Sequence, residues 1–561
     1  MSRNFLTLLA STALAGLALA APASAADVLF LAEDVPAGLN YDGPAAAIPT
    51  SQTGMVNVME PLVYYATKEV NSEGVSIPDF GKFEGRLAES WTFDKATLTW
   101  TFKLRAGVKG CGGATLTADD VLYTFARAKS VSGAAPIGWF LSNVGSIANF
   151  TPAVFGDKEE NKKAKVLGDE VTKVDDLTVK IRQAEPNTLF LPVLTIFGLM
   201  IFDKETMEKH ATKEDPWSHN FVNNEGMGSF GAYCIERWTK DNEFALTANP
   251  DYYRGKPSIG RVVMKKVPQS SNRVVVLQSG QAQLAQSLTP KEYDSLRKAP
   301  GVKVGGHSGN QNLFVHMNFK SKPFDNIKVR QAIAYAIPYD AIIANGYFGQ
   351  ASTWAGVVPS SYPGYAAAAE PYKTDIAKAK ALLAEAGYPD GKGLEAFADS
   401  FALSYVAEKE TTVGPIVNAI QTSLRGAGFP VTLNPMPQTQ YGDRQLVKKD
   451  LPFAINEQEK PIGVDAGYAT QLFFVSGDKG GLNNMINYSN PMVDDTWAKA
   501  RVEPDHAKRD AMLASIQKQL MSDVAWLPVV EYKTQFAWSD KISGIGWHPD
   551  NSIRFFDLKG Q

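Results

Sequence analysis

The chain has 561 residues, which is too long for one hydrophobic core and predicts two or three domains. Hydrophobic residues make up 44% of it and charged residues 20%, as in an ordinary folded globular protein. The formal net charge is −3 and the chain contains no basic block, so we expect neither nucleic acid nor an anionic membrane surface as a partner.

The N-terminus has the pattern of a secretory signal peptide. Arg3 supplies a short positive region, the stretch from Phe5 to Ala21 is apolar, and Ala23-Ser24-Ala25 is a small-x-small cleavage site. We expect cleavage after Ala25. No later segment approaches the ~18 uninterrupted apolar residues of a transmembrane helix. The mature protein is therefore expected to be soluble and exported, most simply into a bacterial periplasm.

Apolar periodicity and turn residues predict strands and helices mixed along the whole chain. Strands, in part paired as hairpins, are expected at 28–31, within 83–105, 171–182 and 233–247, and at 261–267, 312–319, 431–436, 526–532, 535–538 and 553–556. Helices are expected at 54–65, 117–129, 203–210, 270–279, 325–337, 340–346, 375–386, 414–424 and 506–521. The sequence shows no βαβ repeat and no internal period, which indicates a mixed α/β chain of several lobes.

The sequence has only two cysteines, Cys111 and Cys234. In an oxidising compartment they are candidates for one disulfide. The alternative is two separate buried thiols, because sequence does not show whether two Cα atoms come close enough to be bridged.

Glycines at 226–231 match the pattern G-x-G-x-x-G. The preceding residues are polar and the following ones are strand-like, whereas a dinucleotide-binding turn needs a strand before it and a helix after it. Met227 also breaks the pattern G-x-S-x-G of a nucleophilic serine. A tight glycine turn is the simpler interpretation.

Histidines and carboxylates show no catalytic or metal-binding spacing. The six histidines form no H-E-x-x-H pattern and have no cysteine at metal-ligand spacing; they are His210, His219, His307, His316, His506 and His548. Asp119-Asp120 and Asp494-Asp495 lie at expected helix starts, where acidic residues are favoured by the free backbone N–H groups. We therefore predict a binding protein rather than an enzyme, without a cofactor, a metal or a catalytic residue.

Three long segments, taken in chain order, resemble one family. LAESWTFDKATLTWTFKLRAGVKGCGGATLTADDVLYTFAR runs from Leu87 to Arg127, GMGSFGAYCIERWTKDNEFALTANPDYYRGKP from Gly226 to Pro257, and KPFDNIKVRQAIAYAIPYDAIIANGYFGQ from Lys322 to Gln350. All three resemble hallmark segments of the family 5 extracellular solute-binding proteins. These are the peptide-, nickel- and oligosaccharide-binding receptors of ABC importers.

The resemblance implies a mixed α/β fold of the periplasmic-binding-protein type, a two-lobed clamp with an additional third domain (type II, cluster C). After the signal peptide at 1–25, domain I comprises 26–63, 198–311 and 532–561, domain II is 64–197, and domain III is 312–531. Closure of domains I and III is expected to bury the ligand, and the closed form, a monomer, is expected to dock on a membrane permease.

The resemblance also implies where ligand contacts lie. They come from the loop before the first helix, the glycine turn, the start of the domain III strand, cleft-lining segments, a late acidic stretch and the final crossover. The expected ligand-binding residues are Ser51, Gln52, Thr53, Phe230, Asn312, Phe314, His316, Trp354, Phe401, Tyr405, Glu457, Glu459, Asp465, Glu531 and Tyr532. Core packing is the alternative role for the aromatic members.

The sequence departs from the family pattern at the ammonium anchor. Peptide binders of the family carry an Asp that holds the α-ammonium of the peptide, and here Ile462 aligns near it. Glu457, Glu459 or Asp465 are then the candidate substitutes, because a buried ammonium needs a carboxylate partner. Lys460 is the alternative, structural partner for one of them.

A second departure concerns the ligand carboxylate. Dipeptide binders of the family place an Arg where this chain offers Ser400, Phe401 and Tyr405. A longer peptide, or a ligand without a carboxylate, therefore fits this sequence better than a dipeptide.

These observations predict a periplasmic substrate-binding subunit of an ABC importer that captures an oligopeptide-like solute. One alternative is a receptor for a cationic or aromatic small molecule, such as an opine-like amine. Another is a secreted hydrolase whose catalytic residues converge only in the fold, which predicts a nucleophile–base pair inside the cleft. The binding hypothesis predicts aromatic residues and carboxylates between the two lobes.

Overall fold

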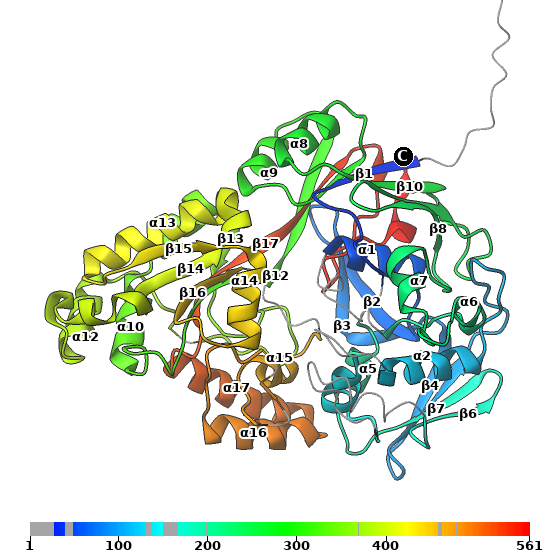
Figure 1. Cartoon of the computed structure of the whole chain (residues 1–561), viewed down its shortest axis with the longest axis horizontal. Coiled ribbons are helices and arrows are strands. Elements are labelled where there is room, and N and C mark those ends of the chain that lie inside the picture. The colour runs from blue at the N-terminus through cyan, green and yellow to red at the C-terminus, as the bar shows by residue number, and fades with distance from the viewer. Residues whose placement is uncertain are drawn as a thin grey trace, which may run out of the picture.

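The computed structural model describes residues 27–39, 49–130, 137–149, 167–196, 199–368, 370–457, 463–477, 480–481 and 483–561. The expected signal peptide and Glu459 lie outside these residues. The described chain forms a mixed α/β structure whose elements gather in two lobes, joined by the long strands β12 and β17 (Figure 1).

One mixed sheet of eleven strands runs through both lobes, in the order β15-β14-β16-β12-β17-β11-β1-β10-β9-β8, with β13 beside β17. The strands are β1 (Asp27–Ala32), β8 (Tyr233–Thr239), β9 (Glu243–Ala248), β10 (Arg261–Lys266), β11 (Leu284–Ala285), β12 (Val302–Met317), β13 (Ala351–Thr353), β14 (Ala402–Val406), β15 (Thr432–Met436), β16 (Phe453–Glu457) and β17 (Leu527–Ser539). We call the β1, β8–β11 side lobe A and the β13–β16 side lobe B.

The strands β12 and β17 cross from lobe A to lobe B as an antiparallel pair. Residues from Val302 to His307 pair with the end of β17 in lobe A, and residues from Gln311 to Val315 pair with its beginning in lobe B. The register shifts between His307 and Gln311. The pair is therefore irregular at the point where it passes between the lobes.

Lobe B is a half-sheet covered by helices. The helices α10 (Ile327–Ala336), α12 (Ile376–Glu385) and α13 (Glu410–Ala427) share its core with Leu313, Val315 and Leu403. Asn326 and Asp375 cap α10 and α12 by accepting backbone N–H groups, and Gly428 ends α13 in the left-handed conformation, with φ 105°.

The remaining helices surround these sheets. They are α1 (Pro49–Val58), α2 (Ala118–Ser130), α3 (Ile137–Trp139), α5 (Phe190–Val193), α6 (Lys204–Lys209), α7 (His219–Asn224), α8 (Ser270–Gln278), α9 (Pro290–Leu296), α11 (Tyr339–Ala341), α14 (Gln438–Gly442), α15 (Ala466–Phe473), α16 (Pro491–Val502) and α17 (His506–Ser522). Short 3₁₀ or π turns are η2 (Phe140–Val144), η4 (Ile342–Gly346), η5 (Pro389–Gly391), η6 (Leu394–Phe401), η7 (Ala407–Lys409), η8 (Asp443–Val447) and η9 (Phe555–Asp557).

A third group of elements, which we call the accessory unit, packs on lobe A. It holds the hairpin β2 (Val63–Val70) and β3 (Ser76–Gly85) and the sheet β4 (Ala88–Asp94), β5 (Thr99–Leu104), β7 (Thr178–Arg182) and β6 (Val171–Asp175), with α2, α3 and α5. A small pair, β18 (Ile542–Ser543) and β19 (Lys559–Gly560), lies near the C-terminus.

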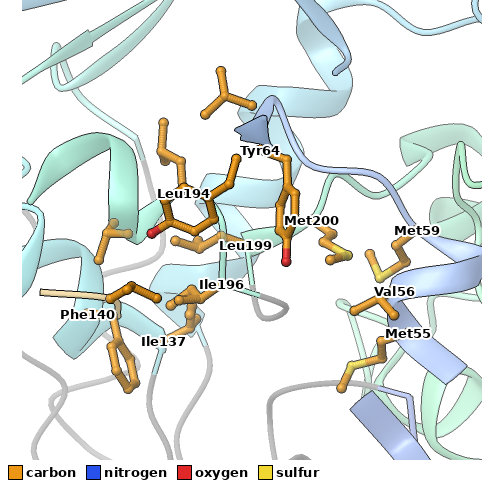
Figure 2. Close-up of a cluster of buried hydrophobic side chains, with 14 of the residues drawn as sticks. Met55, Val56, Met59, Tyr64, Ile137, Phe140, Leu194, Ile196, Leu199 and Met200 are labelled. Atoms are coloured by element: carbon orange, nitrogen blue, oxygen red, sulfur yellow. The ribbon is translucent and has the colours of Figure 1, made fainter. Parts of the chain in front are cut away.

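A buried apolar cluster joins α1 of lobe A to the accessory unit (Figure 2). Met55, Val56 and Met59 come from α1 and the residue after it. They lie near Met200 and Leu199, and the cluster continues to Ile137 and Phe140 of α3 and η2. Burial of these large side chains stabilises the contact, at ~25 cal/mol for each Å² of apolar surface removed from water.

The two cysteines are bonded to each other. Cys111 in the accessory unit and Cys234 in β8 of lobe A form a disulfide, with 5.6 Å between their Cα atoms. Of the two interpretations that the sequence left open, the structure shows the cross-link. It joins positions 123 residues apart.

Some of the predicted elements differ from the structure. The helix expected at 54–65 is wrong in its second half: α1 ends at Val58 and Val63 opens the strand β2, because Pro61 cannot donate to a helix and the β-favouring residues VYY follow. The strand expected at 553–556 is wrong, since Phe555 begins a 3₁₀ turn. The two runs expected at 526–532 and 535–538 form one strand, β17.

Candidate functional site

The alternation of side chains along β12 sorts the predicted residues onto two faces of the lobe B sheet. Leu313, Val315 and Met317 belong to the lobe B core. Phe314 instead belongs to a buried cluster that includes residues of lobe A and the accessory unit. Because successive side chains of a strand point to opposite sides, Asn312 and His316 share the face of Phe314.

The neighbouring strands extend this second face. Asn312 lies directly opposite Glu531 of β17, and Phe314 opposite Asn456 of β16. Directly opposed residues in an antiparallel pair share a face. We call the surface formed by Asn312, Phe314, His316, Asn456 and Glu531 the inner face, since it looks toward the rest of the molecule.

Glu531 is a buried carboxylate of the inner face. It is 6% exposed, and it accepts hydrogen bonds from the Ser360 backbone N–H (2.9 Å) and the Ser360 hydroxyl (2.5 Å). Burial raises the pKa of Glu531, and the two bonds from Ser360 oppose that shift. Within the described part of the chain, Glu531 has no cationic partner within 4.0 Å. A buried carboxylate without a counter-charge is costly, so we expect a group of a ligand to be its partner.

Aromatic rings cover the next part of the inner face. Phe314 and Trp526 stack with their ring centroids 3.9 Å apart. The ring centroids of Phe473, the last residue of α15, and of Phe474 after it lie 4.5 and 4.9 Å from that of Trp526. The indole Nε1 of Trp526 is buried and has no hydrogen-bond partner among the described residues. Trp354 is buried in the same cluster, but its Nε1 donates to the Val358 carbonyl at 3.1 Å.

His316 continues the polar part of the inner face. Its Nδ1 lies 2.9 Å from the Asn456 amide nitrogen, and the Asn456 oxygen accepts from Tyr441 and Gln445. Because Asn456 thereby donates to Nδ1, we assign the imidazole proton to Nε2. That Nε2 is buried without a hydrogen-bond partner in the described chain. Burial lowers the pKa of His316 to about 3, so the ring is a neutral donor.

The start of α1 contributes a separate polar patch. Ser51, Gln52 and Thr53 are all buried, and Ser51 accepts the backbone N–H of Ala37 at 3.1 Å. The hydroxyls of Thr50 and Thr53 are buried and have no partner among the residues described.

The glycine turn packs against lobe A. A side chain at Gly231 would meet the Val58 carbonyl, and one at Gly228 would meet backbone and side-chain atoms of Asp203 and Thr206. These close approaches explain the glycines without a nucleotide. Phe230 between them is fully buried in the core.

Four other predicted residues lie away from the inner face. Phe401 packs against Phe324 and Phe429, and Tyr405 donates to Glu410 at 2.7 Å. Tyr532 donates to Gln311 and stacks on Tyr347, and Tyr347 donates to Glu457 at 3.1 Å. Glu457 lies opposite Leu313, on the core side of the sheet. The structure therefore does not bring Phe401, Tyr405, Glu457 or Tyr532 together with Asn312 and His316.

Hydrogen bonds and an ion pair within lobe B hold the Asp465 carboxylate. Its carboxylate accepts the backbone N–H groups of Gly467 and Tyr468 at the start of α15. Arg509 donates to both oxygens, at 2.6 and 3.0 Å. This buried ion pair accounts for the carboxylate as a structural element, so we do not place it in the site.

Contacts between lobe B and the accessory unit were not predicted. Arg501 of α16 lies 3.0 Å from Glu185 and donates to the Ser146 hydroxyl at 2.7 Å. Gln471 of α15 donates to the Asn143 carbonyl at 2.9 Å. No local sequence signal marks these residues, because the contact exists only when the two units lie together.

Among the described residues, no group of three or more His, Cys, Asp or Glu side chains is arranged to hold a metal ion. Within the same ranges, no helix has the length and apolar character needed to cross a membrane.

The sequence is similar to those of known proteins. The sequence model described as bacterial extracellular solute-binding proteins, family 5 middle, matches residues 82–480. The glutathione-binding protein GsiB of Escherichia coli O1:K1 is 25% identical over 484 residues, which are 85% of this chain and 86% of GsiB.

Solved structures share the fold. The periplasmic binding protein DppA of Helicobacter pylori, in complex with the peptide STSA, has a TM-score of 0.74 and 21% identity over 95% of this chain and 98% of its own. AgaA of A. tumefaciens R10, in complex with agropinic acid, has a TM-score of 0.72 and 22% identity, over 95% of this chain and 99% of AgaA. Both share the two-lobed fold of this chain.

Proposed function

Because the chain belongs to the bacterial extracellular solute-binding proteins of family 5, we propose that it is the periplasmic substrate-binding subunit of an ABC importer. It captures an oligopeptide-like solute between lobes A and B and delivers it to a membrane permease. The inner face is the observation that carries this proposal. It combines stacked aromatic rings with a buried carboxylate and with buried polar atoms that have no hydrogen-bond partner among the described residues.

The domain division follows from the same proposal. Domain I comprises 26–63, 198–311 and 532–561, domain II is 64–197 and domain III is 312–531. The path of β12 and β17 supports these boundaries, since both strands leave one lobe and enter the other near residues 311 and 532. The protein acts as a monomer in the periplasm after cleavage behind Ala25.

Binding without catalysis is part of the proposal. The two histidines with the most strongly lowered pKa values, His316 and His548, have Asn456 and Tyr64 as their hydrogen-bond partners, rather than a serine, threonine or cysteine. Neither is arranged as the base of a nucleophile–base pair.

Two solute classes fit a receptor of this shape. GsiB is named for glutathione, and DppA was solved with a tetrapeptide, which supports a peptide-like ligand. AgaA was solved with agropinic acid. That ligand is not a peptide, so a cationic or aromatic small molecule, such as an opine-like amine, is the second candidate. The buried carboxylate of Glu531 favours a cationic one, because it would supply a counter-charge.

Thermal unfolding with a solute library tests the function. A ligand that binds only the folded protein raises its stability by about 2.7 kcal/mol at a hundredfold excess over Kd. We expect members of a peptide and amine library to raise the melting temperature, and native mass spectrometry of protein purified from its host to show a retained ligand. If no peptide, amine or sugar raises the melting temperature and no ligand is retained, the receptor function is wrong.

A further inference from the structure

We propose that Glu531, Asn312 and Asn310 form a subsite for a cationic group of the solute, a primary ammonium or a guanidinium. The proposal rests on the receptor function above and specifies the chemistry of its ligand. It concerns the part of the inner face where β12 and β17 cross between the lobes.

The three residues lie together at this crossing. Asn312 is directly opposite Glu531 in the antiparallel pair. Asn310 is two residues before Asn312 on the same strand, and its amide donates to the Tyr362 hydroxyl at 3.0 Å. Tyr362 follows Ser360, the residue that holds Glu531, by two positions. The Ser361 N–H and hydroxyl both bond the Gly309 carbonyl, which fixes this segment against the start of the subsite.

The subsite is rich in acceptors. Glu531 offers its carboxylate, and the side-chain oxygens of Asn310 and Asn312 are buried and have no donor among the described residues. Asn310 and Asn312 are only 1% and 2% exposed. An ammonium has three donors and a guanidinium has five, and neither has an acceptor. Such a group would satisfy the unpaired oxygens and neutralise the carboxylate at once.

The cationic side chains described near Glu531 form their ion pairs with another carboxylate. The ion pairs of the neighbouring Lys533 and Arg297 go to Glu73, on the accessory hairpin, and not to Glu531. The pKa values of Tyr362 and Tyr365 are raised, first by burial and then by nearby groups that include Glu531. Burial is the first cause of both shifts, so the surroundings of Glu531 are desolvated.

Donors lie on the same face beyond Phe314. The Trp526 Nε1–H and the His316 Nε2–H are both buried without an acceptor in the described chain. A solute with its cation at Glu531 would therefore place carbonyl or carboxylate oxygens toward these donors, with its body on the Phe314–Trp526 rings. This order of groups distinguishes the solute from a neutral sugar.

The alternative is that Glu531 serves only to hold the segment at Ser360. In that case its substitution would lower the stability of the free protein without changing the preference among ligands. The experiment must therefore measure a preference and not only an affinity.

The probes are two pools of random tripeptides without Lys or Arg, one with a free α-ammonium and one N-acetylated, together with agmatine. Isothermal titration gives the affinity of each for the full-length mature protein. We expect the wild-type protein to bind the free pool or agmatine at least tenfold more tightly than the acetylated pool. In Glu531→Gln and Asn312→Leu, the ratio of the affinity for the free pool or agmatine to the affinity for the acetylated pool should fall below three.

Glu457→Gln is the matched control, because Glu457 is a partly buried carboxylate of the same sheet but accepts from Tyr347 on the core side. It should keep the wild-type ratio. Asn312→Leu leaves the Ser360 contacts of Glu531 in place, so it tests the subsite even if Glu531→Gln folds poorly. An unchanged ratio in a folded Glu531→Gln or Asn312→Leu protein would overturn the subsite.

The outcomes also separate the two proposals. If neutral sugars or the acetylated pool raise the melting temperature but cations do not, the cationic subsite is wrong and the receptor function stands. If no solute of any class binds, the receptor function itself is wrong.

Discussion

Arg501 of lobe B lies 3.0 Å from Glu185 of the accessory unit, across positions that are far apart in the sequence. Arg501 is almost fully buried, with 6% of its side chain exposed, and it also donates to Ser146. The pair therefore links lobe B to the accessory unit in this conformation.

Removing this contact should weaken ligand retention. We expect Arg501→Ala and Glu185→Ala each to speed ligand release. A double-mutant cycle on the release rates of the two single variants and the double variant should give a coupling energy of roughly 0.5–3 kcal/mol, as for other contacting pairs. Stopped-flow fluorescence measures the release rate, and small-angle scattering measures the closed fraction. The control pair Arg182–Asp169 is more exposed and lies within the accessory unit, so its coupling should stay below about 1 kcal/mol. Equal release rates in all variants would show that Arg501 does not contribute to closure.

The disulfide should make a large contribution to stability. Cys111 and Cys234 close a long loop, since they are 123 residues apart. Cross-links of this kind typically contribute about 2–4 kcal/mol by restricting the unfolded chain. We expect Cys111→Ser with Cys234→Ser to lower the free energy of unfolding by that amount in urea titrations. Reductant should destabilise the wild-type protein and leave the double variant unchanged; a response of the double variant to reductant would contradict this account.

His316 should make the protein sensitive to acid. Its pKa is about 3 in the folded protein against 6.5 when exposed, because burial disfavours the charged ring. Between these values the unfolded chain binds the proton and the folded chain does not, so stability present above pH 6.5 is lost as the pH falls toward 3. One such group contributes a slope of about 1.4 kcal/mol per pH unit.

His316→Gln removes that proton while keeping a polar side chain. We expect its unfolding free energy, followed by urea titration from pH 7 to pH 4, to depend less steeply on pH than that of the wild type. His506→Gln is the control, because His506 is exposed at the start of α17. If both variants show the same pH dependence as the wild type, the folded and unfolded chains bind the His316 proton equally, and the prediction is wrong.

The Asp465–Arg509 pair should be essential to the fold of lobe B. Asp465→Asn keeps a good helix cap but leaves Arg509 buried without its counter-charge. Breaking a buried pair in this way typically costs 3–5 kcal/mol. Asp505→Asn is the matched control, because Asp505 also caps a helix through two backbone N–H groups but is exposed. Its cost should stay below about 0.5 kcal/mol. Chemical denaturation of both variants measures the difference, and similar losses would refute the role of the ion pair.

Much of the fold followed from local patterns. The helices α10, α12 and α17 were predicted to within two residues of their observed bounds. They begin where Asn326, Asp375 and Asp505 supply an oxygen to the first turn. The errors lie where context overrides the pattern. The strand β12 begins ten residues before the predicted Asn312, at Val302, because its first half is polar and glycine-rich and becomes a strand by pairing with β17.

The candidate site was predicted less completely, for a geometric reason. Residues 312, 314, 316 and 531 fall on one face, whereas the equally plausible Glu457 and Tyr532 fall on the other. Sequence shows that strand side chains alternate, but the packing of the helices decides which half of the alternation meets the core.

The sequence by itself determined the family, most helices and strands, and the absence of a recognisable catalytic motif, because each of these depends on residues close together in the chain. The tertiary structure alone decided the disulfide, the contact of Arg501 with Glu185 and the isolation of Glu531 from every described cation. These properties depend on distances between segments more than a hundred residues apart in the sequence, and the packing of the whole chain sets those distances.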